Sequence, residues 1–225
     1  MRLLSRIFMA VGFSLLAASA SASPDNPQEG KDYLRLSTPQ QTEAPAGKVE
    51  VLEFFWYNCP HCNVLDPVLH DWVKKQGDKI VFKRVPVAFR DSFVPQQRLY
   101  YALEAMGKAD EMQPKVLRTI HVERRQLDTE AQIVDFIVKQ GIDKQKFLDL
   151  YNSFSVTTKA NRARQLQGIY EISGVPTLAV DGRYVTAPSI VSEGNGRMPE
   201  PALNAATMKV MDFLVEKSAK PAAKK

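Results

Sequence analysis

The chain has 225 residues, of which 44% are hydrophobic, and a formal net charge of +5. This length suffices for one large domain or two small ones with a substantial core. Two of the excess positive charges lie in the first 22 residues and three in the last eight, so the part between them carries no net charge. A neutral body lacks the electrostatic footprint of a phosphate-binding protein, and we expect no nucleic-acid partner.

Residues 1–22 have the pattern of a secretory signal peptide. Arg2 and Arg6 precede an apolar stretch at 7–18, and Ala20-Ser21-Ala22 offers the small residues that signal peptidase cleaves. The stretch is shorter than the roughly 20 residues that a helix needs to cross a bilayer. We therefore expect cleavage after Ala22 and a soluble mature protein in an oxidising compartment, where disulfides persist.

The next segments alternate between strand and helix. β-Branched and aromatic runs predict strands, and apolar residues at helical spacing predict a helix that ends at Gly77. Pro86 should end the third strand or push its later part to an edge. The expected elements are a short edge strand at 33–36, a buried strand at 49–57, a helix at 60–76 and a second buried strand at 80–89.

A helical block follows, and then strand character returns. Thr129 with Gln132 has the spacing of a capping box, and Asp143 suits a helix N-cap. Asp181-Gly182 is a two-residue turn preferred in hairpins. The expected elements are helices at 96–106, 114–121, 129–140, 143–151 and 157–172, hairpin strands at 177–180 and 183–185, a Gly-, Pro- and Ser-rich loop at 187–201 and a last helix at 202–216.

This order, β-α-β, then helices, then β-β-α, predicts an α/β protein with a thioredoxin-like fold and an inserted all-helical domain. The predicted boundaries are a signal peptide at 1–22, a thioredoxin-like domain at 23–91 and 173–217, a helical insertion at 92–172 and a disordered tail at 218–225.

The only cysteines, Cys59 and Cys62, lie where the strand at 49–57 gives way to the helix at 60–76. Free backbone N–H groups and the helix dipole stabilise an anion there, so Cys59 should be a thiolate at neutral pH. Pro60 suits the first helical turn, and a protonated His61 adds a positive charge. Cys62 lies one turn further on the same face and should be the shielded, resolving thiol.

Three other interpretations of the pair are open. A structural disulfide across two residues would constrain little chain entropy. A zinc site needs four ligands, and the remaining histidines, His70 and His121, lie in helical segments without paired spacing, which suits helix surface or satisfied partial burial. The third alternative is an inert pair that arose by chance. The strand-to-helix junction favours redox catalysis over all three, without metal or cofactor.

Three segments together resemble a known family. The sequences LEFFWYNCPHC at 52–62 and GVPTLAVDGRY at 174–184, with the helical block between them, resemble the DsbA-type thiol:disulfide oxidoreductases of the bacterial periplasm. The resemblance covers residues 30–217 and implies a very acidic CxxC thiol and a strongly oxidising disulfide.

The resemblance also assigns roles to residues outside the CPHC motif. Val175-Pro176 matches a loop whose cis-proline faces the disulfide, which leaves the Val175 backbone free to pair with substrate. Glu53 matches a buried acid beneath the cysteines, with Lys83 as its partner. A surface-facing Glu53 is the alternative, because charged groups are almost never buried unpaired.

The implied activity is donation of the Cys59–Cys62 disulfide to unfolded or partly folded exported proteins with free cysteines. The resemblance further implies a periplasmic protein that a quinone-linked inner-membrane partner reoxidises, and we expect a monomer. A reductase or isomerase would use the same site kept reduced, and a chaperone or binding module would tolerate loss of both thiols.

Overall fold

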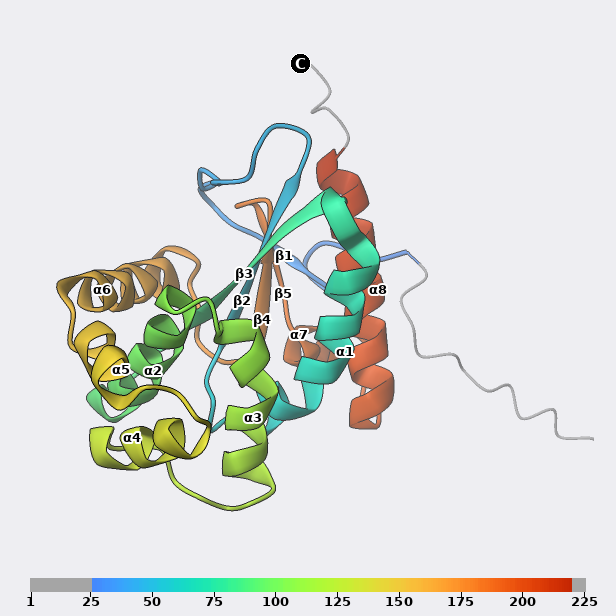
Figure 1. The fold of residues 1–225 in the computed structure, drawn as a ribbon. Helices are drawn as coiled ribbons and strands as arrows, with labels where there is room; N and C mark the ends of the chain where they lie inside the picture. Colours follow the sequence, from blue (N-terminus) through green and yellow to red (C-terminus); the bar gives the residue numbers. More distant parts are fainter. Residues whose placement is uncertain (1–25, 220–225) are drawn as a thin grey trace, which may run out of the picture.

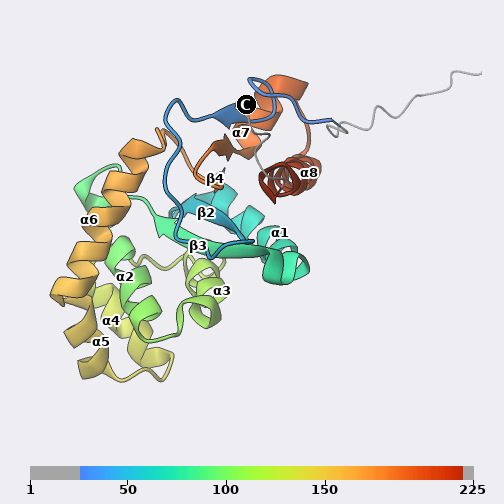
Figure 2. The same ribbon diagram turned by 90° about the horizontal axis from the view of Figure 1, so that it is seen from above.

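The computed structural model describes residues 26–219, which form a five-stranded sheet with helices on both faces (Figures 1 and 2). The strand order is β1-β5-β4-β2-β3. Strand β2 (Val49–Phe55) pairs in parallel with β3 (Ile80–Pro86), and the other pairings are antiparallel. The remaining strands are β1 (Leu34–Arg35), β4 (Thr177–Val180) and β5 (Tyr184–Thr186).

The helices form two groups that lie on opposite faces of the sheet (Figures 1 and 2). Helix α1 (Pro60–Gln76), which a 3₁₀ turn at Gly77–Lys79 follows, packs beside α8 (Glu200–Ala219). The helical block begins with a 3₁₀ turn at Asp91–Phe93. It then comprises α2 (Val94–Ala105), α3 (Ala109–His121), α4 (Glu130–Lys139), α5 (Lys144–Tyr151) and α6 (Phe154–Ile169).

The side chains of β2 point alternately to the two faces of the sheet and belong to two separate parts of the core. Val49 and Val51 join the cluster formed with α1 and α8, whereas Leu52 and Phe54 join the cluster formed with the helical block. Successive strand residues point to opposite faces, so a strand buried on both faces serves both clusters. The run VEVLEFF is buried throughout, as predicted for a central strand.

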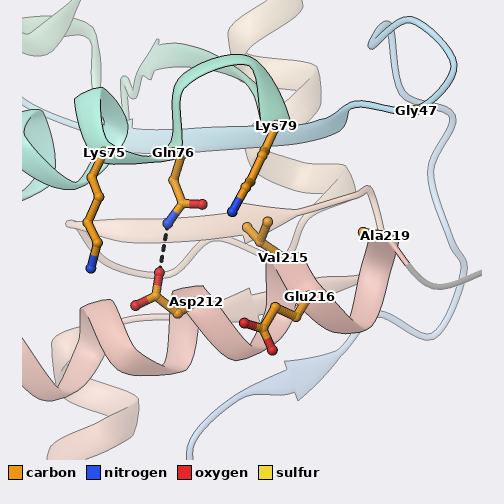
Figure 3. Close-up of a pocket in the computed structure, with 8 residues that line it drawn as sticks. All are labelled: Gly47, Lys75, Gln76, Lys79, Asp212, Val215, Glu216 and Ala219. Atoms are coloured by element: carbon orange, nitrogen blue, oxygen red, sulfur yellow. Dashed lines mark hydrogen bonds between the residues drawn. The ribbon is translucent and has the colours of Figure 1, made fainter.

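The residues at the ends of α1, α4 and α5 form the predicted helix caps. Cys59 is the N-cap of α1, Pro60 occupies its first turn, and Gly77 ends it with a positive φ of 55°. The capping box of Thr129 and Gln132 is present, and the Asp143 side chain accepts a hydrogen bond from the Lys146 N–H. At the far end of α1, Gln76 Nε2 donates a 2.7 Å hydrogen bond to Asp212 Oδ1 of α8, in a hollow of about 590 Å³ (Figure 3).

The structure corrects several predicted bounds: α3 begins at Ala109 and not at 114, α6 lies three residues earlier than predicted, and β3 ends at Pro86. The segment at 187–201, expected to be a loop, contains α7 (Pro188–Asn195), because Pro188 suits a first turn and Val191 is fully buried. The last helix runs to Ala219, two residues into the predicted tail. The proposed signal peptide and residues 220–225 lie outside the described residues. Among residues 26–219, no helix has the length and hydrophobicity to span a bilayer.

Candidate active site

The loop after β2 places the two cysteines at the start of α1. Cys59 has extended backbone angles, and its Sγ accepts a hydrogen bond from the Cys62 N–H at 3.4 Å. Both cysteines are free in this structure; Cys59 is 7% exposed and Cys62 2% exposed. Cys62 therefore faces inward, and Cys59 is the more accessible sulfur of the pair.

The two thiols differ in acidity. A hydrogen bond from the Cys62 side chain is the largest cause that lowers the pKa of Cys59, to about 6. Backbone N–H groups of Cys62 and His61 and the charge of His61 act in the same direction, against burial. Burial is the main cause that raises the pKa of Cys62 well above its ordinary value. At neutral pH, the site therefore holds a thiolate at Cys59 and a thiol at Cys62.

The loop before β4 lies against the outer sulfur. The Val175–Pro176 peptide bond is cis, as the family resemblance implied, and the Val175 carbonyl oxygen lies 3.4 Å from Cys59 Sγ. Pro176 and Val175 also line a hollow of about 330 Å³, together with His61 and residues of α7 and α8. An accessible backbone segment and a hollow thus flank Cys59, which is the arrangement that an extended polypeptide could occupy.

His61 has a carboxylate partner that the sequence did not reveal. Its Nδ1 lies 2.7 Å from Oε1 of Glu200, the first residue of α8. This hydrogen bond is the largest cause that raises the pKa of His61, and the charges of Glu200 and Cys59 add to it. The CPHC motif is therefore connected to the C-terminal helix, 139 residues further along the chain.

The buried acid Glu53 is confirmed as buried, but its partner is not Lys83. Glu53 is 1% exposed, and its Oε2 accepts a 2.9 Å hydrogen bond from Arg84 Nε. Lys83 instead bonds Glu43 and Glu50 on the other face of the sheet. The register pairs Glu53 with Arg84, and a shift of one residue along a strand reverses the face.

Arg84 connects three carboxylates beneath the cysteines. Besides Glu53, it donates to Asp66 of α1 and Asp110 of α3, each at 3.2 Å. Burial nevertheless raises the pKa of Glu53 to about 7, since the attraction of Arg84 only partly compensates it. A buried carboxylic acid that titrates near neutrality therefore lies below the dithiol.

Two contacts hold the loop before Cys59 against the helical block. His121 Nε2 lies 2.8 Å from the Tyr57 carbonyl oxygen, which agrees with the predicted satisfied partial burial of this histidine. Asn58 Nδ2 donates to Asp128 Oδ1 at 3.0 Å, and Gln96 Nε2 donates to the same oxygen. Sequence patterns could not identify these pairs, because their members lie 64 and 70 residues apart.

No group of three or more His, Cys, Asp or Glu side chains within residues 26–219 is arranged to hold a metal ion. His121 is bonded to a backbone carbonyl, and His70 lies exposed on α1.

Comparisons with known proteins agree with this site. A family model for the DSBA-like thioredoxin domain matches residues 50–200. The chain is 46% identical over 215 residues to a thiol:disulfide interchange protein DsbA of Burkholderia cepacia, covering 96% of both chains. It is 36% identical to a protein of the same name from Pseudomonas aeruginosa, covering 91% of this chain and 92% of the relative.

Solved structures show the same fold. The crystal structure of Pseudomonas aeruginosa DsbA matches with a TM-score of 0.76 and 34% identity, covering 86% of this chain and 95% of that one. The reduced DsbA1 of Neisseria meningitidis matches with a TM-score of 0.72 and 27% identity, covering 87% and 97%. The predicted thioredoxin-like fold with inserted helices is thereby confirmed.

Proposed function

Because the chain belongs to the family of DsbA-like thioredoxin domain proteins and is a thiol:disulfide oxidoreductase, we propose that it works as an oxidase. In this proposal, the thioredoxin-like part at 23–91 and 173–217 carries the reaction, and the helical insertion at 92–172 covers it from one side. The protein donates its Cys59–Cys62 disulfide to exported proteins that have free cysteines.

The opposite pKa shifts of the two cysteines carry this proposal. The pKa of Cys59 is lowered to about 6, whereas that of Cys62 is raised. Stabilising the thiolate of the reduced protein makes reduction of its disulfide more favourable, so the disulfide becomes a stronger oxidant. The same stabilisation makes Cys59 the better leaving group in exchange.

The reaction consists of two exchanges. A client thiolate attacks Cys59 Sγ, the bond to Cys62 breaks, and its electron pair passes to Cys62, which takes up a proton. A second client thiolate then attacks the client sulfur of the mixed disulfide and expels Cys59 as a thiolate. The client loses two electrons and the protein gains two. The low exposure of Cys62 supports attack at Cys59 alone.

The Val175–Pro176 segment and the hollow beside it are proposed to bind the client. An extended client segment would lie along the Val175 backbone, next to Cys59 Sγ, with a side chain in the hollow that His61 and Pro176 help to line. Glu53 and Arg84 would have a supporting role below this site. The pKa of Glu53 is about 7, so its charge changes near neutral pH, and this charge interacts with that of Cys59.

The proposed compartment is the periplasm, and turnover requires a partner that accepts two electrons from reduced Cys59 and Cys62. We assign this role to a quinone-linked protein of the inner membrane, as the family resemblance implies, and expect the protein to act as a monomer. The signal-like residues 1–22 support export.

Client oxidation tests the proposal. Oxidised protein is mixed with an unfolded, reduced client, and client disulfides are counted against thiols that appear on the protein. An oxidase gives one client disulfide for each Cys59–Cys62 pair reduced. A reductase gives no client disulfides and instead cleaves those of an oxidised client, whereas a binding module exchanges nothing and binds clients equally well without its thiols.

A further inference from the structure

Glu200 reaches the CPHC motif from a distant part of the chain. It is the first residue of α8, and its Oε1 lies 2.7 Å from His61 Nδ1 in the first turn of α1. The side chains of His61 and Glu200 are 69% and 38% exposed, so this is a surface pair at the rim of the hollow beside Val175. Its short distance is that of a charge-assisted hydrogen bond.

The contact fixes two properties of His61. With Nδ1 directed at a carboxylate, the imidazole has one preferred ring orientation instead of several. The carboxylate also favours the protonated ring, since an opposite charge stabilises the charged form. Glu200 lies in the first turn of α8, a position where acidic side chains stabilise a helix.

The charge of His61 bears on the reactive sulfur. The positive ring and its backbone N–H both lower the pKa of Cys59, and the thiolate in turn raises the pKa of His61. The groups that set the charge of His61 are thus Glu200 and Cys59, and the other residues that line the hollow are uncharged. A change at Glu200 should therefore reach Cys59 through His61.

We propose that Glu200 is a positioning residue of the disulfide-exchange site, which holds the His61 ring in place and keeps it positively charged beside the Cys59 thiolate. This deepens the proposed oxidase function and rests on it for its biological meaning. Its consequence is that the oxidising strength of the dithiol depends on the first residue of α8. Loss of the carboxylate should leave a weaker oxidant with the same fold.

The test compares E200Q with E216Q, which removes the same charge from an exposed position of the same helix. Sixteen residues of helix put the two positions about 24 Å apart. The glutathione equilibrium of each purified, full-length protein is measured at pH 7. We expect E200Q to shift the equilibrium about two- to five-fold toward the oxidised protein, the range for exposed charge interactions, and E216Q to leave it unchanged.

Two further readouts separate positioning from a merely structural effect. NMR titration of His61 should give a lower pKa in E200Q than in the wild type, and thiolate absorbance should give a higher pKa for Cys59. The shift in the glutathione equilibrium should be largest at pH values where His61 is protonated in the wild type but neutral in E200Q. It should vanish at pH values where His61 is protonated in both proteins or neutral in both. In an H61S background, E200Q should have no effect.

An unchanged glutathione equilibrium in E200Q would overturn the inference. So would an E200Q shift of equal size in the H61S background, or a shift of equal size in E216Q. These readouts compare a variant with the wild type, so they do not depend on where the wild-type equilibrium itself lies, which is what the oxidase proposal predicts. If the wild type oxidises clients and E200Q matches it in every titration, the inference fails and the function stands. If E200Q shifts the titrations while the wild type oxidises no client, the inference stands and the oxidase function fails.

Discussion

Reducing the Cys59–Cys62 disulfide should make the stability of this protein depend on pH in a way that the oxidised form does not share. The folded pKa of Cys59 is lowered from 9.0 to about 6. A depressed thiol pKa adds stability that is fully present above the unfolded pKa and is lost as pH falls through the folded one. The relevant window is thus pH 5 to 8, below the range where the raised pKa of Cys62 opposes folding.

The size of the effect follows from the two pKa values. Since one unit corresponds to about 1.4 kcal/mol, the thiolate contributes almost nothing at pH 5, about 1.4 kcal/mol at pH 7 and about 2.7 kcal/mol at pH 8. Cys59 is only 7% exposed, so solvent screening does not remove most of this contribution. The oxidised form has no thiolate and gains none of it.

The assay is denaturant unfolding of the reduced and oxidised forms at pH 5, 6, 7 and 8, with oxygen excluded from the reduced samples. The free energy of unfolding of the reduced form, minus that of the oxidised form, should rise by about 1.4 kcal/mol from pH 5 to pH 7. The Cys59→Ser/Cys62→Ser variant should show no such redox-dependent rise. A difference between the two forms that stays constant across this range would refute the argument for an acidic Cys59.

Three other predictions follow from the geometry of the site. Cys59→Ser should abolish client oxidation, whereas Cys62→Ala should accumulate mixed disulfides through Cys59 on non-reducing gels; client capture through Cys62 would reverse the assigned roles. Arg84→Met should cost about 3–5 kcal/mol in denaturant unfolding, because it leaves Glu53 buried without its cation, and a cost of about 1 kcal/mol or less would contradict the assigned pairing. Asp128→Ala should lower the free energy of unfolding by about 1–3 kcal/mol, because the Gln96 amide loses its acceptor. An unchanged unfolding midpoint would show that this contact to the helical block does not stabilise the protein.

Local signals made much of the fold predictable. The N-cap, Pro60 and Gly77 mark both ends of α1, so its bounds agree with the predicted 60–76. The capping box at Thr129 marks the start of α4 for the same reason. By contrast, α7 has the composition of a loop, and its helix depends on burial of Val191, which requires knowledge of the packed structure.

The site was predictable only where its residues are neighbours in sequence. The CPHC motif and the strand-to-helix junction indicated Cys59 and Cys62, but the partner of Glu53 depends on strand register. An assignment that differs by one residue selects Lys83, on the opposite face, in place of Arg84. The contact between His61 and Glu200 joins residues 139 positions apart, and no local pattern identifies it.

Electrons should flow from clients into the Cys59–Cys62 disulfide, and the glutathione equilibrium of the wild-type protein tests this direction most directly. Protein is equilibrated at pH 7 with mixtures of reduced and oxidised glutathione, and the fraction of reduced protein is determined by thiol alkylation. We expect an equilibrium far toward reduced protein and oxidised glutathione, because the Cys59 thiolate stabilises the reduced form. An equilibrium that favours the protein disulfide would contradict the oxidase function and support a reductase.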